Sequence, residues 1–314
     1  MGDYHQAFWT DYITKATKKT KTKLPESVFI KLVKRWAFFD KSYKLSQVKK
    51  DLKKFPKFLD WVLETDKENH KEIYKDNSDD VLSDLARRLS RRMAVTEPDV
   101  HEQSENWNQE TCLLITYADS ITDDNAQSPL ASLGQFCEAH LDEMISTVHI
   151  LPFFPSSGDD GFAVSDHNCV DPPLGTWEDI SYLSTKYRIM ADLVLNHGAR
   201  SSVLFQQFLN DEAPGNSFFL SVDENFDASH VIRPRGHPLL QKVETVSGVK
   251  TIWCTFSEEQ VDYDFSNPGV LEFFLNLILN FIDHGVSVLR LDAVGFLWKR
   301  SGTTCLNLSQ THAI

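Results

Sequence analysis

Beyond residue 105, short apolar runs alternate with segments in which apolar residues recur every three or four positions. The second pattern is that of a helix packed on one side. The short runs are rich in β-branched residues and predict strands buried on both faces, as in a parallel sheet. The predicted strands are 113–117, 147–151, 189–195 and 286–292, and the predicted helices are 129–141, 176–187, 202–210 and 268–284.

The last predicted helix carries marks of both its ends. Asn267 and Pro268 are typical of an N-cap and a first helical position, and Gly285 stands where a glycine ends a helix. Apolar residues between these ends form one stripe, which we expect to face the core: Leu271, Phe274, Leu275, Ile278 and Ile282.

Two stretches depart from the alternating pattern. Residues 1–105 show helical spacing with almost no glycine, and Pro98 marks the boundary of a helical N-terminal extension. Residues 212–265, inside the expected second domain of 106–314, are rich in loops and predict an insertion. The insertion contains a probable hairpin of 243–246 and 250–256 that turns at Ser247-Gly248.

The order of strands and helices predicts an α/β fold with a parallel sheet. A doubly wound sheet and a (β/α)8 barrel share this pattern. Polar residues at the carboxyl ends of three strands favour the barrel, because barrel enzymes keep their chemistry at that edge. These residues are Asp119, Asn196, His197 and Asp292. The sequence thus contains strands one to four of a barrel.

Charge and cysteine content exclude several classes of partner. The formal net charge of −13 repels a phosphate backbone, so we expect no nucleic-acid partner. The N-terminus has no apolar segment typical of a secretory signal, and no apolar run is long enough to span a membrane. Five widely spaced cysteines without CxxC pairs fit reduced thiols, which indicates a cytoplasmic protein.

Arg290 and Asp292 are the strongest candidates for chemistry in the fourth predicted strand. They are two residues apart, so their side chains leave the same face, while Leu289 and Leu291 take the other face, towards the helices. A buried carboxylate beside a guanidinium stays ionised, as a nucleophile must. A structural ion pair explains the same spacing equally well.

Two further segments carry polar candidates. His197 follows the third predicted strand, where a lone histidine is more often a hydrogen-bonded loop anchor than a catalytic base. The acidic loop 157–167, which includes Asp159 and Phe162, does not have the spacing of a calcium-binding EF-hand. Its carboxylates and aromatic ring suit a sugar, although an ordinary solvated turn is as consistent with the pattern.

Residues 114–307 resemble the sucrose-phosphorylase and glucosylglycerate-phosphorylase branch of the α-amylase superfamily, glycoside hydrolase family 13. The motifs that carry the resemblance occur collinearly. They are ITYADS (115–120), VHILPFFP (148–155), Asp159-x-Gly161-Phe162, LGTWEDI (174–180), MADLVLNH (190–197), RPRG (233–236), QVDYDF (260–265), RLDAVGF (290–296) and GTTC (302–305).

The resemblance implies a role for each matched residue. Asp292 would be the nucleophile and Arg290 its orienting partner. Asp159 and His197 would bind the glucosyl hydroxyls, with Phe162 as a stacking platform. Arg235 and Gln260 would lie near the acceptor side.

One departure from the wider superfamily bears on the reaction. Gly295-Phe296 stands where hydrolases commonly have a Lys-His pair, and the phosphorylase branch has this small-aromatic version. The departure favours phosphorolysis, and it gives no reason to carry over the calcium site of many amylases. The expected co-substrate is inorganic phosphate, with no metal and no other cofactor.

Retaining chemistry needs two carboxyl groups about 5–5.5 Å apart, a nucleophile and an acid/base. The resemblance places the acid/base glutamate after strand five, which the sequence does not reach. We therefore predict a truncated chain that is inactive alone. Two alternatives stay open: an α-glucosidase or transglucosidase of the same family, and a non-catalytic sugar- or protein-binding derivative. The helical extension resembles the glucosylglycerate-phosphorylase group, which favours glucosylglycerate over sucrose as the substrate.

Overall fold

A computed structural model describes residues 108–109, 111–123, 125–142 and 144–314. The chain divides into two compact units, Met1–Asn106 and Trp107–Ile314, and all described residues lie in the second. The predicted helical extension over residues 1–105 lies outside the described residues.

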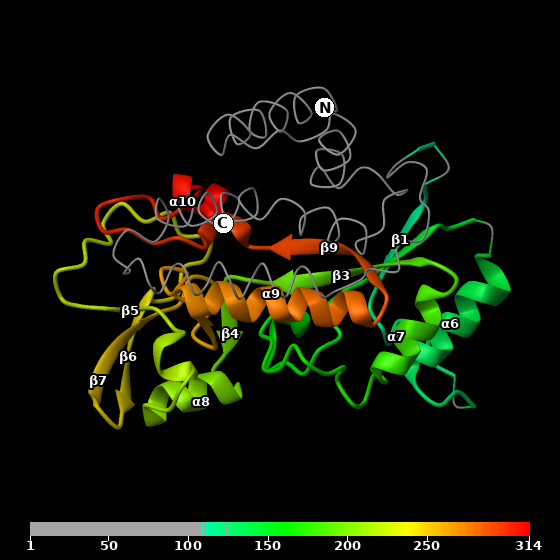
Figure 1. The fold of residues 1–314 in the computed structure, drawn as a ribbon, viewed down its shortest axis with the longest axis horizontal. Coiled ribbons are helices and arrows are strands. Elements are labelled where there is room, and N and C mark those ends of the chain that lie inside the picture. The colour runs from blue at the N-terminus through cyan, green and yellow to red at the C-terminus, as the bar shows by residue number, and fades with distance from the viewer. Residues whose placement is uncertain (1–107, 110, 124, 143) are drawn as a thin grey trace, which may run out of the picture. The chain divides into compact units, whose positions relative to one another are not determined.

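A four-stranded parallel sheet forms the centre of the described unit (Figure 1), in the order β1-β2-β3-β9. The predicted strands are confirmed to within about one residue at each end. Apart from the partly buried Met190, the apolar residues of β2 and β3 are buried, because helices and loops cover the sheet. The strands are β1 (Leu113–Thr116), β2 (Thr147–Ile150), β3 (Arg188–Val194) and β9 (Val286–Asp292).

A helix or helix-containing segment connects each pair of neighbouring strands, as the pattern predicted. α6 (Pro129–His140) begins where the Ser128 side chain accepts a hydrogen bond from the Ala131 amide at 3.0 Å. α7 (Trp177–Ser184) begins with a capping box formed by Thr176 and Asp179. α9 (Pro268–Asp283) has Asn267 as its N-cap and is followed by Gly285 at φ 91°, so both predicted end signals are confirmed.

The buried face of α9 differs from the predicted stripe. The fully buried apolar side chains after its first residue are those of Val270, Phe274, Leu277 and Phe281, whereas Ile282 is 37% exposed. Eleven of the 16 residues of this helix are apolar, so more than one apolar stripe has helical spacing. The packing partners select one of them: Phe281 stacks on Phe154 and Phe274 on Phe265, with ring centroids 5.2 and 5.6 Å apart.

The outer face of β9 also differs from the expectation. Leu289 packs against the core as predicted, but Leu291 is 47% exposed. Among the described residues β9 pairs with β3 alone, and Val286 is the one residue of β9 that is buried. The alternation of side chains along β9 was predicted correctly. The burial of Leu291 was not, because no described element packs over it closely enough to bury it.

Residues 212–265, expected as an insertion, contain a separate three-stranded antiparallel sheet, β5-β7-β6. The hairpin of β6 and β7 turns at Val246-Ser247, one residue before the predicted turn, because Thr245 pairs with Gly248. Gly248 adopts φ 118° and begins the second strand. The elements are η2 (Gly215–Ser217), β5 (Ser221–Val222), β6 (Leu240–Thr245), β7 (Gly248–Trp253) and β8 (Gln260–Asp262).

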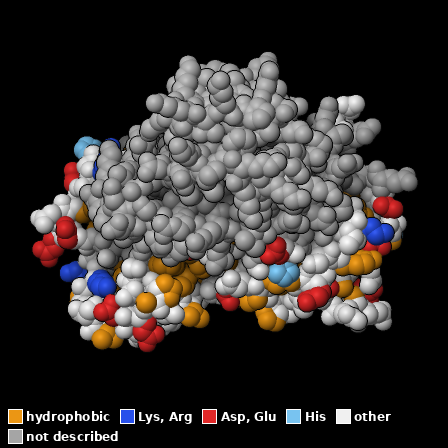
Figure 2. Space-filling model, viewed as in Figure 1, with side chains coloured by type: hydrophobic (Ala, Val, Ile, Leu, Met, Phe, Trp, Pro, Cys, Tyr) orange, Lys and Arg blue, Asp and Glu red, His pale blue; other side chains and the backbone are white. Residues whose placement is uncertain are grey.

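α8 (Val203–Asn210) lies beside the β6–β7 hairpin, towards one end of the sheet (Figure 1). In the region that they occupy, hydrophobic side chains reach the surface (Figure 2). The most exposed are Val203, Val246 and Val249. They belong to the insertion and the helix before it, and no candidate site residue is among them.

The carboxyl ends of β3 and β9 lead into short elements that complete the described unit. β3 is followed by β4 (His197–Ala199), which pairs with β8 in an antiparallel ladder. β9 leads into η3 (Val294–Phe296), and α10 (Ser309–Ala313) follows near the C-terminus. The loop after β2 contains η1 (Asp159–Gly161). These segments surround the edge where the sequence placed its polar candidates.

Candidate active site

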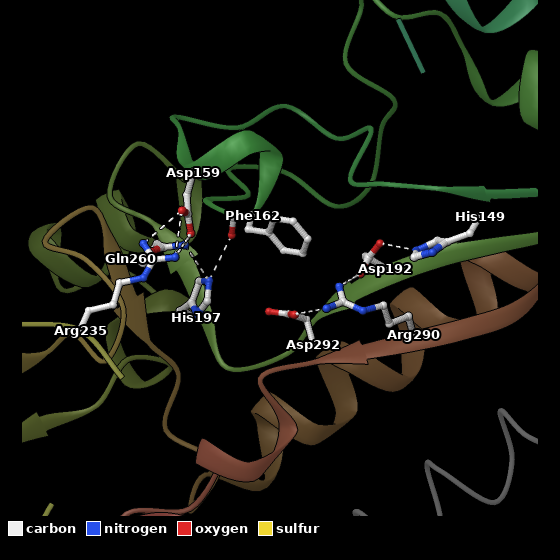
Figure 3. A network of polar contacts seen from close by, with 9 residues as sticks. All are labelled: His149, Asp159, Phe162, Asp192, His197, Arg235, Gln260, Arg290 and Asp292. Atoms are coloured by element: carbon white, nitrogen blue, oxygen red, sulfur yellow. Dashed lines mark hydrogen bonds and ion pairs between the residues drawn. The ribbon is translucent and has the colours of Figure 1, made fainter. Parts of the chain in front are cut away.

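Arg290 and Asp292 share a face of β9, as predicted. Nη2 of Arg290 lies 3.1 Å from Oδ1 of Asp292, and Nη1 binds Oδ1 of Asp192 on the adjacent strand. The ladder explains this contact, because Asp192 pairs directly with Arg290 in the register of β3 and β9. One guanidinium therefore joins two carboxylates, one fully buried and one at the mouth of the site (Figure 3).

Asp192 has a second buried partner on the other side. Oδ2 of Asp192 lies 2.7 Å from Nε2 of His149 on β2, and both side chains are almost wholly inaccessible to solvent. An ionised carboxylate can only accept, so Nε2 of His149 carries the proton of this hydrogen bond. Side chains from three neighbouring strands thus form one row, which we call the sheet cluster: His149, Asp192, Arg290 and Asp292.

A second group of side chains lies around Asp159 in η1. Both amino groups of Arg235 donate to the Asp159 carboxylate at 3.1–3.3 Å, and Nε2 of Gln260 donates to Oδ2 at 2.9 Å. Asp159 adopts φ 53°, a left-handed conformation that non-glycine residues rarely take, and its hydrogen bonds help to hold it there. We call Asp159, His197, Arg235 and Gln260 the rim cluster.

His197 lies in β4, opposite Asp262 of β8, and is buried. Its Nε2 lies 3.1 Å from the Phe162 carbonyl and 3.1 Å from Nε2 of Gln260. Because the Phe162 carbonyl can only accept, Nε2 of His197 carries the proton and donates to it, and Nδ1 of His197 accepts from Asn196 at 3.4 Å. Burial lowers the pKa of His197, so the neutral ring is favoured.

Phe162 connects the two clusters. Its carbonyl accepts the hydrogen bond from His197, while its ring lies under the Arg290 guanidinium at 5.5 Å from the centroid (Figure 3). Asp159, Phe162, His197, Arg235, Gln260, Arg290 and Asp292 are therefore all brought together. Gln260 lies between Asp159 and His197 and is fully buried, so it is an integral part of the rim cluster.

The pKa values of Asp292 and Asp159 are shifted in opposite directions. Burial raises the pKa of Asp292 and outweighs the lowering by Arg290 and His197. The sequence argument considered the guanidinium, which lowers the pKa, and did not weigh burial, which is the larger effect. Burial also raises the pKa of Asp159, but the hydrogen bonds from Gln260 and Arg235 exceed that effect, and the pKa lies below its ordinary value.

A buried ion pair joins the segment after Asp292 to the β4–β8 ladder, which carries two residues of the rim cluster. Nζ of Lys299 lies 2.6 Å from Oδ2 of Asp262 and donates to Oδ1 of Asn196 at 2.9 Å. Asn196 also donates to Asp262, and so does Thr255, through both its amide and its hydroxyl. Since Lys299 and Asp262 are both buried, each requires the other charge.

Sequence reasoning missed three contributors to this arrangement: His149, Phe256 and Lys299. Phe256 lies against His197, Arg235 and Phe296, at centroid distances of 5.2, 6.0 and 5.3 Å. No local pattern marks an aromatic loop residue as part of a site. His149 could have been found, because it is the one ionisable residue in an otherwise uncharged buried strand, Thr147–Ile150.

The described residues form neither a metal-ion cluster nor a membrane-spanning helix. Within the described ranges no group of three or more His, Cys, Asp or Glu side chains could hold a metal ion. No helix in that part of the chain is long and apolar enough to cross a membrane. All five cysteines are described, and all are free thiols.

The chain belongs to the α-amylase family. The model of the alpha amylase catalytic domain matches residues 141–311, more than half of the chain and almost all of the part that bears the site. The four parallel strands are accordingly four of the eight strands of a (β/α)8 barrel, and the predicted fold class is confirmed.

Among curated relatives, the chain is 46% identical over 208 residues to a glucosylglycerate phosphorylase of Allomeiothermus silvanus. The match covers 66% of this chain and 37% of that protein. A glucosylglycerate phosphorylase of Escherichia coli is 38% identical over 213 residues, with 68% and 38% covered. The chain therefore spans less than half the length of these relatives.

A solved structure gives the same result. The crystal structure of sucrose 6F-phosphate phosphorylase from Thermoanaerobacter thermosaccharolyticum matches with a TM-score of 0.59 and 32% sequence identity. The match covers 67% of this chain and 45% of that one. The predicted resemblance to the phosphorylase branch is thus confirmed at the level of family and relatives.

Proposed function

We propose that this chain carries part of the active site of a retaining α-glucoside phosphorylase, which transfers a glucosyl group from an α-glucoside to inorganic phosphate. The carrying observation is that Asp292, paired with Arg290, faces the same site as Asp159, His197 and Gln260 (Figure 3). The relatives of the chain include glucosylglycerate phosphorylases and sucrose 6(F)-phosphate phosphorylase.

Asp292 is the proposed nucleophile. Its carboxylate would attack the anomeric carbon while the bond from that carbon to the aglycone oxygen breaks, and the aglycone oxygen would take up a proton. A phosphate oxygen would then attack the same carbon and displace Asp292, releasing α-glucose 1-phosphate. Arg290 supports this role, because its guanidinium holds Asp292 by one amino group and Asp192 by the other.

The rim cluster is proposed to bind the glucosyl hydroxyls. Asp159 would accept from hydroxyls once Arg235 gives up part of its contact, and Gln260 and His197 lie within 3.1 Å of each other beside it. Phe162 is the proposed stacking platform. Arg235 lies on an exposed loop with its side chain half exposed, which suits a role towards the acceptor.

We further propose that residues 1–314 alone do not complete turnover. A retaining mechanism needs a second carboxyl group that can exchange a proton. The carboxylates of Asp192 and Asp159 act electrostatically on Asp292, and each already binds an arginine. The acid/base would come from chain that this sequence does not contain.

The proposed donor is glucosylglycerate, supported by three glucosylglycerate phosphorylases among the relatives. The proposed partners are this small carbohydrate and inorganic phosphate, with no other cofactor and no metal. The proposed location is the cytoplasm, supported by five free thiols, which fit a reducing compartment.

α-Glucosyl fluoride tests the nucleophile separately from the acid/base. Fluoride leaves without needing a proton from the enzyme, so a chain that lacks the acid/base can still form a glucosyl ester at Asp292. The measurement is intact-mass and peptide mass spectrometry of the full chain after incubation with the fluoride. We expect one added glucosyl group on the peptide that contains Asp292.

Two variants make this experiment decisive. Asp292→Asn should remain unlabelled, whereas Asp119→Asn, at an exposed position after β1, should be labelled as the unchanged chain is. Labelling of Asp292→Asn to the same extent would show that Asp292 is not the nucleophile. Release of α-glucose 1-phosphate from glucosylglycerate by the unchanged chain would contradict the proposed need for an external acid/base.

A further inference from the structure

His149 lies behind the residues that face the substrate and contacts none of the rim cluster directly. It is on β2, two strands away from Asp292 on β9. Its side chain is 4% exposed and its one described polar contact is the 2.7 Å hydrogen bond to Asp192. Burying an imidazole in the middle of a four-residue strand is unfavourable unless its nitrogen has a partner.

Asp192 divides its two oxygens between two donors. Oδ1 binds Nη1 of Arg290, and Oδ2 binds Nε2 of His149. Because each oxygen has its own donor, the carboxylate has one preferred rotation. Arg290 therefore meets a single oxygen of Asp192, and its second amino group is left to bind Asp292 at 3.1 Å.

Loss of the His149 donor would leave Asp192 with a donor on one of its two oxygens alone. Oδ2 of Asp192 would then lie in a buried place without a hydrogen bond, which costs free energy for an ionised group. Arg290 already binds Oδ1 of the same carboxylate, and its other amino group could turn to Oδ2. A bidentate contact between Arg290 and Asp192 would satisfy both oxygens, and it would draw the guanidinium away from Asp292.

We propose that His149 is a positioning residue for Asp292: it directs one oxygen of Asp192 away from Arg290 and so leaves the guanidinium free to hold the nucleophile. The proposal rests on the proposed function for the role of Asp292. The chain of contacts that it describes crosses three neighbouring strands, from His149 through Asp192 and Arg290 to Asp292 (Figure 3).

Carbon-13 NMR of the full chain with labelled aspartate carboxyl groups tests the proposal, with Asp292→Asn used to assign the resonance. His149→Leu removes the donor and keeps an apolar side chain in the strand. We expect the titration midpoint of Asp292 to move upward in this variant, because Asp292 loses the cation that opposes the effect of burial on its pKa.

Two other variants separate positioning from general damage to the strand. His149→Gln should restore the unchanged midpoint, because the Nε2 atoms of glutamine and histidine are both three bonds beyond Cβ. Thr147 lies in the same buried strand as His149 and accepts a hydrogen bond from Arg188 on β3. Thr147→Val removes this hydrogen bond and should also leave the midpoint in place. An unchanged midpoint in His149→Leu, or an equal shift in Thr147→Val, would overturn the proposal.

Binding of glucose, measured by calorimetry on the same proteins, keeps this inference distinct from the proposed function. The rim cluster does not include His149, so His149→Leu should bind glucose as the unchanged chain does. Failure of every protein to bind glucose would count against the proposed function, while the titration of Asp292 would still decide the role of His149. Loss of glucose binding in His149→Leu with retention in Thr147→Val would contradict a role confined to Asp292.

Discussion

The sheet cluster obtains its geometry from the ladder of β2, β3 and β9, whereas the rim cluster joins two residues of the β4–β8 ladder to two residues outside any strand, Asp159 and Arg235. Asp192 and Arg290 meet because they are paired in register. Asp159 and Arg235 are 76 residues apart, on a short 3₁₀ turn and an exposed loop, and only their own hydrogen bonds join them.

The residues that carry this difference also differ in burial. The Asp192 side chain has no exposed area, while those of Arg235 and Asp159 are 48% and 28% exposed. Buried charges depend on their partners for stability, whereas exposed pairs contribute little. The sheet cluster should therefore behave as part of the fold, and the rim cluster as a surface that can rearrange.

The largest effect is expected at Lys299, which binds Asp262 and Asn196 beside the rim cluster. Lys299→Met leaves Asp262 buried without a cation, and we expect the free energy of unfolding to fall by about 3–5 kcal/mol. Urea unfolding followed by circular dichroism measures this change. Adding Asp262→Asn should recover most of the loss, and Lys242→Met, at an exposed position, should change stability by less than about 0.5 kcal/mol. Equal losses in Lys242→Met and Lys299→Met would be inconsistent with the buried pair.

Asp192→Ala should have the next largest effect. It removes the buried acceptor of both His149 and Arg290, and we expect a loss of about 2–3 kcal/mol. The loss should be smaller than at Lys299, because Arg290 is partly exposed and can turn towards water. The same urea experiment measures it, with Asp119→Ala as the exposed control. A loss no greater than that of Asp119→Ala would remove the distinction between the two clusters.

Acid should destabilise the protein through His167, in the loop between η1 and α7. Burial lowers the pKa of His167 from 6.5 to about 4. As pH falls below 6.5 the unfolded chain binds the proton first, so stability present above that pH is lost progressively towards about pH 4. Between pH 7 and pH 5 the loss should be about 2 kcal/mol.

His167→Phe provides the matched measurement. The ring lies among Phe154 and Phe274, so phenylalanine suits the site but cannot titrate. Urea unfolding at pH 7 and at pH 5 should show a smaller difference for this variant than for the unchanged chain. The same difference in both proteins would mean that other groups cause the acid sensitivity.

The smallest effect on stability is expected at Arg235. The Arg235–Asp159 pair is exposed, so Arg235→Ala should cost less than about 1 kcal/mol. It should nevertheless raise the pKa of Asp159, because a hydrogen bond and a cation are lost. The carboxyl titration of Asp159 measures this, with Arg233→Ala as the control. An unchanged titration would show that Arg235 does not hold Asp159 in solution.

Much of the fold could be predicted, because buried parallel strands and helix ends leave local signals. The apolar runs, Asn267-Pro268 and Gly285 determined element positions to within a residue or two. The buried face of α9 was missed, although its polar residues recur at helical spacing and mark the opposite face: Glu272, Asn276, Asn280 and Asp283. The exposure of Leu291 depends on which elements pack against β9. The alternation of residues along a strand predicts the two faces, but it does not predict what packs against each face.

The site was predictable where chemistry follows from spacing or from motifs, as for Arg290, Asp292, Asp159 and His197. The acidity of Asp292 was not, because the balance between burial and a guanidinium depends on three-dimensional distances. Lys299 was not found either. A lysine after a strand is usually solvated, and only the tertiary structure shows that its ammonium is enclosed by Asp262 and Asn196.

The Lys299 ion pair also bears on the order in which the chain can fold. Lys299 is 103 residues from Asn196 along the sequence, so this contact closes a long loop. Until Lys299 arrives, burying Asp262 and Asn196 would leave a carboxylate without a counter-ion, and the ladder of β4 and β8 is disfavoured. Because contacts of such separation form slowly, the ladder of β4 and β8 should become ordered late, after residue 299 has left the ribosome.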